Sequence, residues 1–361
     1  MKLNNLNSFK DKKVLVTGHT GFKGSWLCHW LVRLGASVVG ISKDIPTEPS
    51  IFKETGLADI VTSYFLDLAD TESFLAMFNE LQPDIVFHLA AQPIVLSSYN
   101  DPVNTMRSNV VGTLSVLEAL RNCTLPCVAV LITSDKVYDN IEQIYGYRED
   151  DKVGGKDIYS ASKGAAELVI RGYFESFLAK DENIRVGIAR AGNVIGGGDW
   201  ADHRIVVDCM LAWSKGERVS VRNPNSTIPW QHVLEPLFGY LCLASNLLLS
   251  DANDGQAFNF GPEPSLVISV EKLISDLGDV WGIEKPFVVP NLLENTLHEA
   301  QLLKLDCDKA RALLGWTPKL SYPDVIQLTA GWYYQFYQGD SQCTQLIKSD
   351  IDFFEKRIKS S

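Results

Sequence analysis

Tyr159 and Lys163 carry the strongest chemical signal in the sequence. They are four residues apart, in Tyr-Ser-Ala-Ser-Lys, and this spacing places both side chains on one face of a helix. A neighbouring ammonium favours the ionised form of a phenol and therefore lowers its pKa. We expect Tyr159 to take a proton from a substrate hydroxyl as a hydride leaves the same carbon. The alternative is an ordinary Tyr/Lys pair on the surface of an amphipathic helix.

A second candidate cluster lies upstream of Tyr159. An apolar run ends at Thr133 and is followed by Ser134, Asp135 and Lys136, which supply a hydroxyl, an acid and an amine. Ligands of parallel sheets bind beyond the carboxyl ends of the strands. A turn that merely ends a strand would also favour Ser and Asp. Because Tyr159 follows, we interpret Ser134, Asp135 and Lys136 as catalytic candidates.

Gly18, Gly21 and Gly24 follow an apolar run at residues 14–16 in G-x-x-G-x-x-G spacing and precede an apolar helix near Ser25. Glycines allow a tight turn and a close approach of the backbone to a pyrophosphate, and the helix N-terminus offers unpaired N–H groups. Three glycines alone would indicate only a turn. The order strand, glycines, helix predicts a dinucleotide site.

The end of the second predicted strand leaves both NAD and NADP open. An acidic residue there usually binds the adenosine ribose, but residues 40–43 are Gly-Ile-Ser-Lys. Asp44 would suit NAD, whereas Ser42 and Lys43 would tolerate the 2′-phosphate of NADP, and all three would also suit a solvated turn. Asp67, after the third strand, is expected either to bind the adenine amine or to cap a helix.

The elements that position these residues alternate up to about residue 190. Short Val/Ile/Leu-rich runs predict strands at Lys13–Thr17, Ser37–Ile41, Val61–Leu66, Ile85–Leu89, Val128–Thr133 and Arg185–Arg190. Amphipathic stretches predict helices at Ser25–Leu34, Thr71–Leu81, Pro102–Asn122 and Tyr159–Ala179. This alternation is typical of a parallel sheet between helices.

The expected fold is therefore α/β, with a Rossmann-type doubly wound parallel sheet. We place the dinucleotide-binding domain at residues 1–190. Residues 191–355, richer in Gly and Pro turns, would form mainly a smaller C-terminal α/β substrate lobe, part of which can return to the Rossmann sheet.

Composition narrows the class of protein. A chain of 361 residues with 46% hydrophobic and 21% charged residues is typical of a globular protein with two lobes. No apolar run is long enough to span a bilayer and Met1 to Lys13 lack the features of a secretory signal, so we expect a cytoplasmic protein without membrane contact. The net charge of −11 opposes binding to nucleic acid. The seven scattered cysteines predict no metal site.

Together these motifs resemble the nucleotide-sugar 4,6-dehydratases of the extended short-chain dehydrogenase/reductase superfamily, above all their CDP-glucose branch. The resemblance covers nearly the whole chain. Its segments are Gly18–Gly24, His88–Pro93, Ser108–Val110, Thr133–Lys136, Gly146–Glu149, Tyr159–Lys163, Arg190–Trp200, Pro229–Pro236 and Lys304–Asp306.

The resemblance implies a redox-neutral dehydration in which NAD, or NADP, takes up a hydride and returns it. Tyr159 would deprotonate the C4 hydroxyl of the sugar, supported by Ser134 and Lys163, and Asp135 as a neutral acid would protonate the departing C6 hydroxyl. Lys136 stands where the dTDP-glucose enzymes have a glutamate that removes the C5 proton. A lysine can do so only if its pKa is lowered.

The resemblance also implies a set of binding residues and a partner. The cofactor set comprises Gly18, His19, Gly21, Phe22, Gly24, Ser42, Asp67, Leu68, Leu89, Ala90, Ala91, Asn109, Tyr159 and Lys163. The nucleotide-sugar set comprises Asn193, Arg204, Arg222 and His298. A homodimer is implied, through a four-helix interface made by the helices near 102–122 and 159–179, as is a role in deoxysugar biosynthesis such as that of O-antigens.

Two positions depart from the CDP-glucose branch, and two other functions need consideration. Leu96 and Ile228 stand where that branch has arginine, and an arginine near the second position usually binds the substrate diphosphate. An epimerase on the same scaffold would need Tyr159 and Lys163 but no acid for elimination, and a silent binding protein would be expected to lose Tyr159 or Lys163. The presence of Asp135 and Lys136 favours dehydration.

Overall fold

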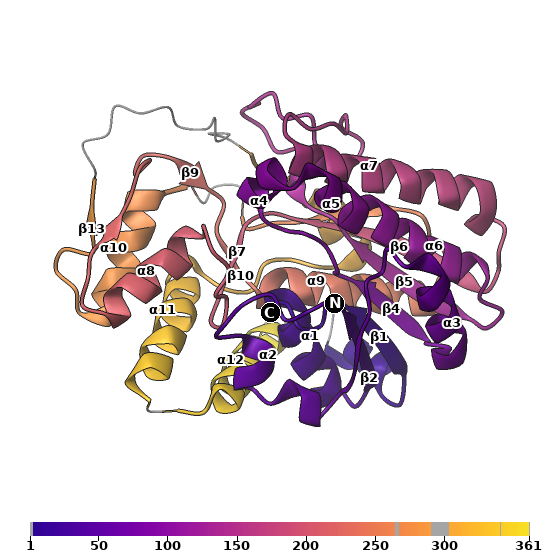
Figure 1. Ribbon diagram of the computed structural model, residues 1–361, viewed down its shortest axis with the longest axis horizontal. Coiled ribbons are helices and arrows are strands. Elements are labelled where there is room, and N and C mark those ends of the chain that lie inside the picture. The colour runs from indigo at the N-terminus through magenta and orange to yellow at the C-terminus, as the bar shows by residue number, and fades with distance from the viewer. Residues whose placement is uncertain (1–2, 264–266, 290–302, 340, 361) are drawn as a thin grey trace.

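Seven parallel strands form the central sheet of the computed structural model, which describes residues 3–263, 267–289, 303–339 and 341–360. The strand order is β11-β6-β5-β4-β1-β2-β3 (Figure 1). The strands are β1 Lys13–Thr17, β2 Ser37–Ser42, β3 Thr62–Phe65, β4 Ile85–His88, β5 Cys127–Ile132, β6 Ile184–Ala191 and β11 Ala257–Phe260. The expected Rossmann-type α/β fold is confirmed.

Both faces of the sheet are covered because the strand residues alternate between two apolar cores. Val14 and Val16 face the core that contains Trp26 of α1, whereas Leu15 between them faces the core that contains Phe74 of α3. This period of two in strands buried on both faces is the reason why the strand sequences are apolar throughout. The sheet therefore lies between two helical layers (Figure 1).

The helices of the first half lie close to their predicted places. They are α1 Phe22–Arg33, α2 Ile51–Glu54, α3 Thr71–Leu81, α4 Val95–Asn100, α5 Pro102–Met106, α6 Gly112–Arg121 and α7 Ile158–Tyr173. Helix α3 has the predicted bounds, whereas α1 begins three residues before the predicted Ser25, directly at the glycine turn. The predicted helix 102–122 contains a π-helical turn at Arg107–Val111, and α7 continues into another at Phe174–Leu178.

Segments of the second half return to the sheet. Strand β11 pairs in parallel with β6, α9 (Leu234–Leu249) packs against β5 and β6, and α12 (Cys343–Ser360) packs against α1. The remaining elements are α8 Ile205–Ser214, α10 Val270–Trp281, α11 Tyr322–Gln338, β7 Val194–Ile195, β8 Val219–Ser220, β9 Thr227–Ile228, β10 Gln231–His232, β12 Ile268–Ser269 and β13 Phe287–Val288. Helices α8, α10 and α11 lie together beside the sheet domain (Figure 1).

In the part of the chain that the structure describes, no helix is long and apolar enough to cross a bilayer.

Candidate active site

The glycine turn after β1 is shaped by close backbone contacts. Gly18 has a φ of 77°, and a Cβ added to it would lie 2.8 Å from the amide nitrogen of Ala90. A Cβ on Gly24 would lie 2.1 Å from the carbonyl oxygen of Gly18. Gly21 is the N-cap of α1 and provides no side-chain cap, so the first-turn N–H groups are left for a ligand. The turn therefore fits the pyrophosphate of a dinucleotide.

His19 and Ser42 stabilise this turn through hydrogen bonds. The buried His19 ring places Nδ1 2.8 Å from the hydroxyl oxygen of Ser42 and Nε2 3.0 Å from that of Ser63. Burial lowers the pKa of His19 to about 4, so the ring is neutral. The Ser42 hydroxyl also accepts the N–H of Thr20 at 3.2 Å. Both side chains are thus engaged in holding the turn.

Lys43 and Asp67 meet beyond the ends of β2 and β3. The Lys43 ammonium lies 3.1 Å from the Asp67 carboxylate, and the other carboxylate oxygen accepts the N–H of Ala69 at 3.0 Å. The two residues that sequence considered separately therefore form an ion pair. A 2′-phosphate on the cofactor would have to compete with Asp67 for Lys43.

The catalytic candidates Ser134, Asp135 and Tyr159 come together at the carboxyl edge of β5. The side chains of Tyr159 and Ser134 are hydrogen-bonded, and the Ser134 hydroxyl donates to Asp135 at 3.0 Å. The side chain of Asp157 caps α7 by accepting the N–H of Ser160 at 2.9 Å, which places Tyr159 in the first turn. Ser134, Asp135 and Tyr159 are all buried, so the cluster is shielded from water.

Burial sets the protonation of this cluster. It raises the pKa of Asp135, against the opposing effects of Lys136 and Ser134, and so favours the neutral acid. It also raises the pKa of Tyr159 to about 12, although the Ser134 hydrogen bond opposes this. The expectation of a lowered pKa for Tyr159 is wrong, because desolvation of the phenol outweighs the opposing charge of Arg204. Burial lowers the pKa of Lys163 to about 8.

Lys23 joins this cluster from the first turn of α1, and the sequence did not predict it. Its ammonium interacts electrostatically with Asp135, Asp199, Lys163 and Arg204, and its pKa is lowered to about 7, first by burial and then by Arg204. Arg204 itself lies 2.6 Å from the Asp199 carboxylate. A lysine inside a glycine turn was the available sequence signal. Lys23, Lys163 and Arg204 therefore act on one another electrostatically next to Asp135 and Asp199.

Asn109 connects the helices around the cluster. Its side-chain oxygen accepts the N–H of Gln92 at 2.8 Å, and its side-chain nitrogen donates to the Ser162 hydroxyl at 2.8 Å. Asn109 lies in the π-helical turn before α6, so it ties that turn to the loop after β4 and to α7. Lys136 is half-buried next to Asp135.

The remaining cofactor candidates surround the ends of the first strands. Leu68 is buried after β3, and Leu89, Ala90 and Ala91 are half-buried after β4. Phe22 is half-buried in the first turn of α1, next to the glycine turn. These positions are consistent with the walls of a dinucleotide site.

The predicted substrate residues are less tightly grouped. A Cβ on Gly192 would lie 3.0 Å from Asp135, so the neighbouring Asn193, which is exposed, begins at the edge of the cluster. Arg222 is exposed and interacts electrostatically with Asp208 of α8. His298 lies outside the described residues. Of the substrate candidates, only Arg204 is among the groups that interact with Tyr159.

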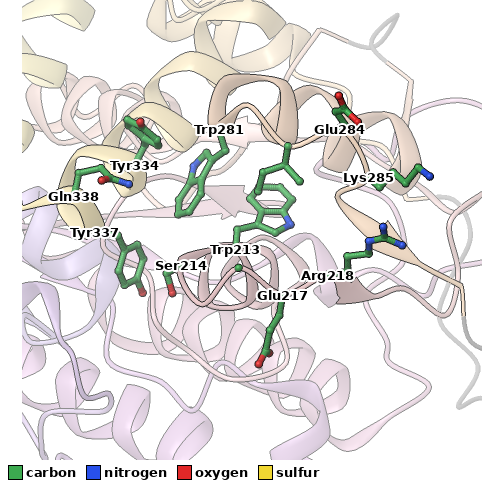
Figure 2. Close-up of a pocket in the computed structure, with 12 residues that line it drawn as sticks. Trp213, Ser214, Glu217, Arg218, Trp281, Glu284, Lys285, Tyr334, Tyr337 and Gln338 are labelled. Atoms are coloured by element: carbon green, nitrogen blue, oxygen red, sulfur yellow. The ribbon is translucent and has the colours of Figure 1, made fainter.

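A separate hollow lies in the C-terminal lobe at the last turns of α8, α10 and α11 (Figure 2). Its volume is about 610 Å³, and Trp213, Trp281, Tyr334 and Tyr337 are among its lining residues. None of the described residues predicted to bind cofactor or substrate lines it. We therefore locate the candidate active site at the carboxyl edge of the sheet.

Known proteins are similar to this chain over most of its length. Residues 15–191 match the family model described as GDP-mannose 4,6 dehydratase. The CDP-glucose 4,6-dehydratase of Salmonella typhimurium is 43% identical over 350 residues, which cover 95% of this chain and 97% of that protein. The chain therefore belongs to the nucleotide-sugar 4,6-dehydratase family of the extended short-chain dehydrogenase/reductases.

Solved structures show the same fold at lower identity. The dTDP-glucose 4,6-dehydratase of Bacillus anthracis in complex with NAD has a TM-score of 0.75 and 16% identity, over 91% of this chain and 98% of that one. The UDP-glucuronic acid 4-epimerase of Bacillus cereus, in complex with UDP-glucuronic acid and NAD, has a TM-score of 0.77 and 23% identity, over 90% of this chain and 100% of that one. Dehydratases and epimerases thus share this architecture.

Proposed function

We propose that this protein is a lyase that converts CDP-glucose to CDP-4-keto-6-deoxyglucose and water, with NAD as a recycled cofactor. The observation that carries the proposal is the buried Asp135, whose pKa burial raises and whose carboxyl group is hydrogen-bonded to Ser134 next to Tyr159. The 43% identity to the Salmonella enzyme supports the substrate.

The residues divide the reaction between them. Tyr159 takes the proton of the C4 hydroxyl, and the charge of Arg204 favours its ionised form. Asp135 donates its proton to the departing C6 hydroxyl. Lys136, in the same turn, is our candidate for the base that removes the C5 proton. The bound nicotinamide supplies hydride uptake and return, and Lys163 is placed to bind its ribose.

We infer NAD rather than NADP from the end of β2. The Ser42 hydroxyl is hydrogen-bonded to His19 and Thr20, and the Lys43 ammonium is paired with Asp67. A 2′-phosphate would therefore have to displace one of these partners to bind Ser42 or Lys43. The dehydratase and epimerase structures with this fold are likewise complexes with NAD.

Mass spectrometry after incubation with CDP-, dTDP-, UDP- and GDP-glucose tests the proposal. We expect the mass of CDP-glucose to fall by one water while the cofactor is unchanged at the end of the reaction. An epimerase would give a product of unchanged mass, and a silent binding protein would give no product. Either result with every sugar nucleotide would contradict the proposal.

We also propose that the protein is a cytoplasmic homodimer that contributes to deoxysugar biosynthesis. Val103 of α5 is 77% exposed and Leu168 of α7 is 62% exposed, although both are apolar. Helices α5 and α7 are in contact and run along the outside of the sheet domain, so the same pair from a second copy would complete a four-helix interface (Figure 1). Light scattering of wild-type and Leu168→Glu protein tests this, because the variant should be monomeric.

A further inference from the structure

A buried ion pair lies one helical turn beyond Lys163. Glu167 of α7 and Arg190 of β6 have side chains that are only 4% and 5% exposed. The Arg190 Nε donates to one Glu167 oxygen at 2.8 Å, and its Nη2 bonds the other oxygen. The Thr133 hydroxyl donates to the first oxygen at 2.6 Å. The Glu167 carboxylate is therefore occupied on both of its oxygens.

Arg190 is itself held in place from the other side. Its Nη1 donates to the Tyr138 hydroxyl and to the carbonyl oxygen of Glu149, each at 2.8 Å, and its guanidinium lies 4.9 Å from the centre of the Tyr138 ring. The Tyr138 hydroxyl donates in turn to Asn259 at 2.8 Å. These contacts fix the guanidinium in a direction that draws Glu167 toward β6.

The position of Glu167 would otherwise suit Lys163. Residues four apart on a helix are neighbours, and opposite charges at that spacing usually pair. Among the ion pairs of the described residues, however, Glu167 pairs with Arg190 and not with Lys163. Glu167 acts on Lys163 only through space, where it partly opposes the burial that lowers the pKa of Lys163 to about 8.

We propose that Arg190 is a positioning residue that occupies the Glu167 carboxylate and so leaves the Lys163 amine free for the cofactor. The inference rests on the proposed function in that it gives Lys163 its role at the cofactor ribose. A buried carboxylate that loses its partner is strongly destabilised. Without Arg190, Glu167 would turn to Lys163, a cation four residues earlier on the same helix on which it already acts, and would hold that side chain away from the cofactor.

Other charged groups around Lys163 do not replace Glu167 in this role. Lys23 of α1 and His88 of β4 interact electrostatically with Lys163. Lys23 carries the same charge, and burial holds His88 neutral by lowering its pKa to about 3. Whether the Lys163 amine is available to the cofactor thus depends on whether the Glu167 carboxylate points to Arg190 or to Lys163.

The test measures the proton affinity of Lys163 directly. Arg190→Met, Glu167→Gln and the double variant are labelled with trace acetic anhydride at a series of pH values, and Lys163 acetylation is read by mass spectrometry. Arg190→Met should shift the labelling midpoint of Lys163 upward by about one pH unit, a tenfold change in proton affinity. Glu167→Gln should shift it downward. The double variant should not show the upward shift of Arg190→Met.

Rate measurements with the holoenzyme complete the test. We expect cofactor reduction by substrate to slow at least tenfold in Arg190→Met and to recover severalfold when Glu167→Gln is added. Arg33→Met is the matched control, because Arg33 pairs with Glu355 far from the site and its loss should leave Lys163 labelling unchanged. A role in stability alone predicts that the double variant is no faster than Arg190→Met, and this result would overturn the proposal.

The proposal can still be tested if Arg190→Met does not fold or if the wild-type protein is inactive. If Arg190→Met does not fold, as judged by circular dichroism, Glu167→Gln alone decides: an unchanged Lys163 midpoint in that variant overturns the proposal. If wild-type protein acts on no nucleotide sugar, the proposed function fails. The labelling of Lys163 still tests the role of Arg190 in that case, because the labelling needs no substrate.

Discussion

The two sides of the active site are built differently. On the chemical side, at β5 and α7, Ser134, Asp135 and Tyr159 are buried and bonded to one another. On the substrate side, after β6, Asn193 and Arg222 are exposed, and Arg204 is held mainly by Asp199. The chemistry is therefore fixed by packing, whereas recognition depends on side chains on loops, which change at little cost to the fold.

This difference predicts where amino-acid substitutions between relatives should occur. A buried acid such as Asp135 keeps its proton only while its surroundings stay intact, so its neighbours are constrained together. Ile228 of β9, which comes after β6, and Leu96 of α4, which comes after β4, are half-buried aliphatic side chains. We expect substitutions on the chemical side to abolish steps of the reaction and substitutions on the substrate side to change affinity.

The largest effect is expected from Tyr159→Phe. The variant keeps the ring and its packing but loses the proton acceptor, so kcat should fall by roughly 10²- to 10⁴-fold. Cofactor affinity, measured by fluorescence titration, should stay nearly unchanged. Turnover close to that of the wild type would remove Tyr159 from the mechanism.

Asp135→Asn separates oxidation from elimination on the chemical side. The amide cannot donate the proton that the C6 hydroxyl needs, whereas Tyr159 remains able to act at C4. Reduced cofactor should therefore accumulate in a single turnover, visible by its near-ultraviolet absorbance, while overall dehydration slows by about 10²-fold or more. Dehydration at the wild-type rate would show that another group is the acid.

The pH dependence of cofactor reduction probes Lys163. Burial lowers its pKa to about 8, so its ammonium is present below that pH and is lost above it. If the ammonium supports Tyr159, its loss above pH 8 offsets the gain from ionisation of Tyr159, whose pKa is about 12, so the single-turnover rate of cofactor reduction should rise up to about pH 8 and level off above it. A rate that rises steadily through pH 9 would contradict this role.

The smallest effect is expected from Ile228→Arg on the substrate side. A charge-assisted hydrogen bond contributes roughly 1.5–3 kcal/mol when fully formed, equivalent to about 10- to 150-fold in affinity. We expect KM for CDP-glucose to fall severalfold with little change in kcat, and Ile228→Leu to serve as the control without charge. If the wild type already uses CDP-glucose best among the four nucleotide sugars and the variant brings no gain, Ile228 is only a packing residue.

Local pattern was enough to predict the parts of the site that depend on one strand, turn or helix. The six strands predicted before residue 191 lie within one residue of their observed ends, because their apolar runs are bounded by turns. The spacing of Tyr159 and Lys163 on a helix, and the glycine turn at Gly18, were likewise readable from local sequence.

Features that depend on distant segments were missed. Arg190 reaches Glu167 across the boundary between β6 and α7, and Lys23 reaches Asp135 from the first turn of α1. The pKa of Tyr159 moved opposite to expectation because the degree of burial of its hydroxyl is a property of the folded chain. Glu167, a second charged residue one turn after Lys163 on the same helix, was the sequence signal that deserved interpretation.

The transfer of deuterium from C4 to C6 tests the central claim most directly. CDP-glucose labelled with deuterium at C4 is incubated with the enzyme, and the product is examined by mass spectrometry and NMR. Dehydration with internal hydride return predicts a product that is lighter by one water and carries the deuterium at C6. Deuterium retained at C4 in a product of unchanged mass would show an epimerase, and would contradict the roles assigned to Asp135 and Lys136.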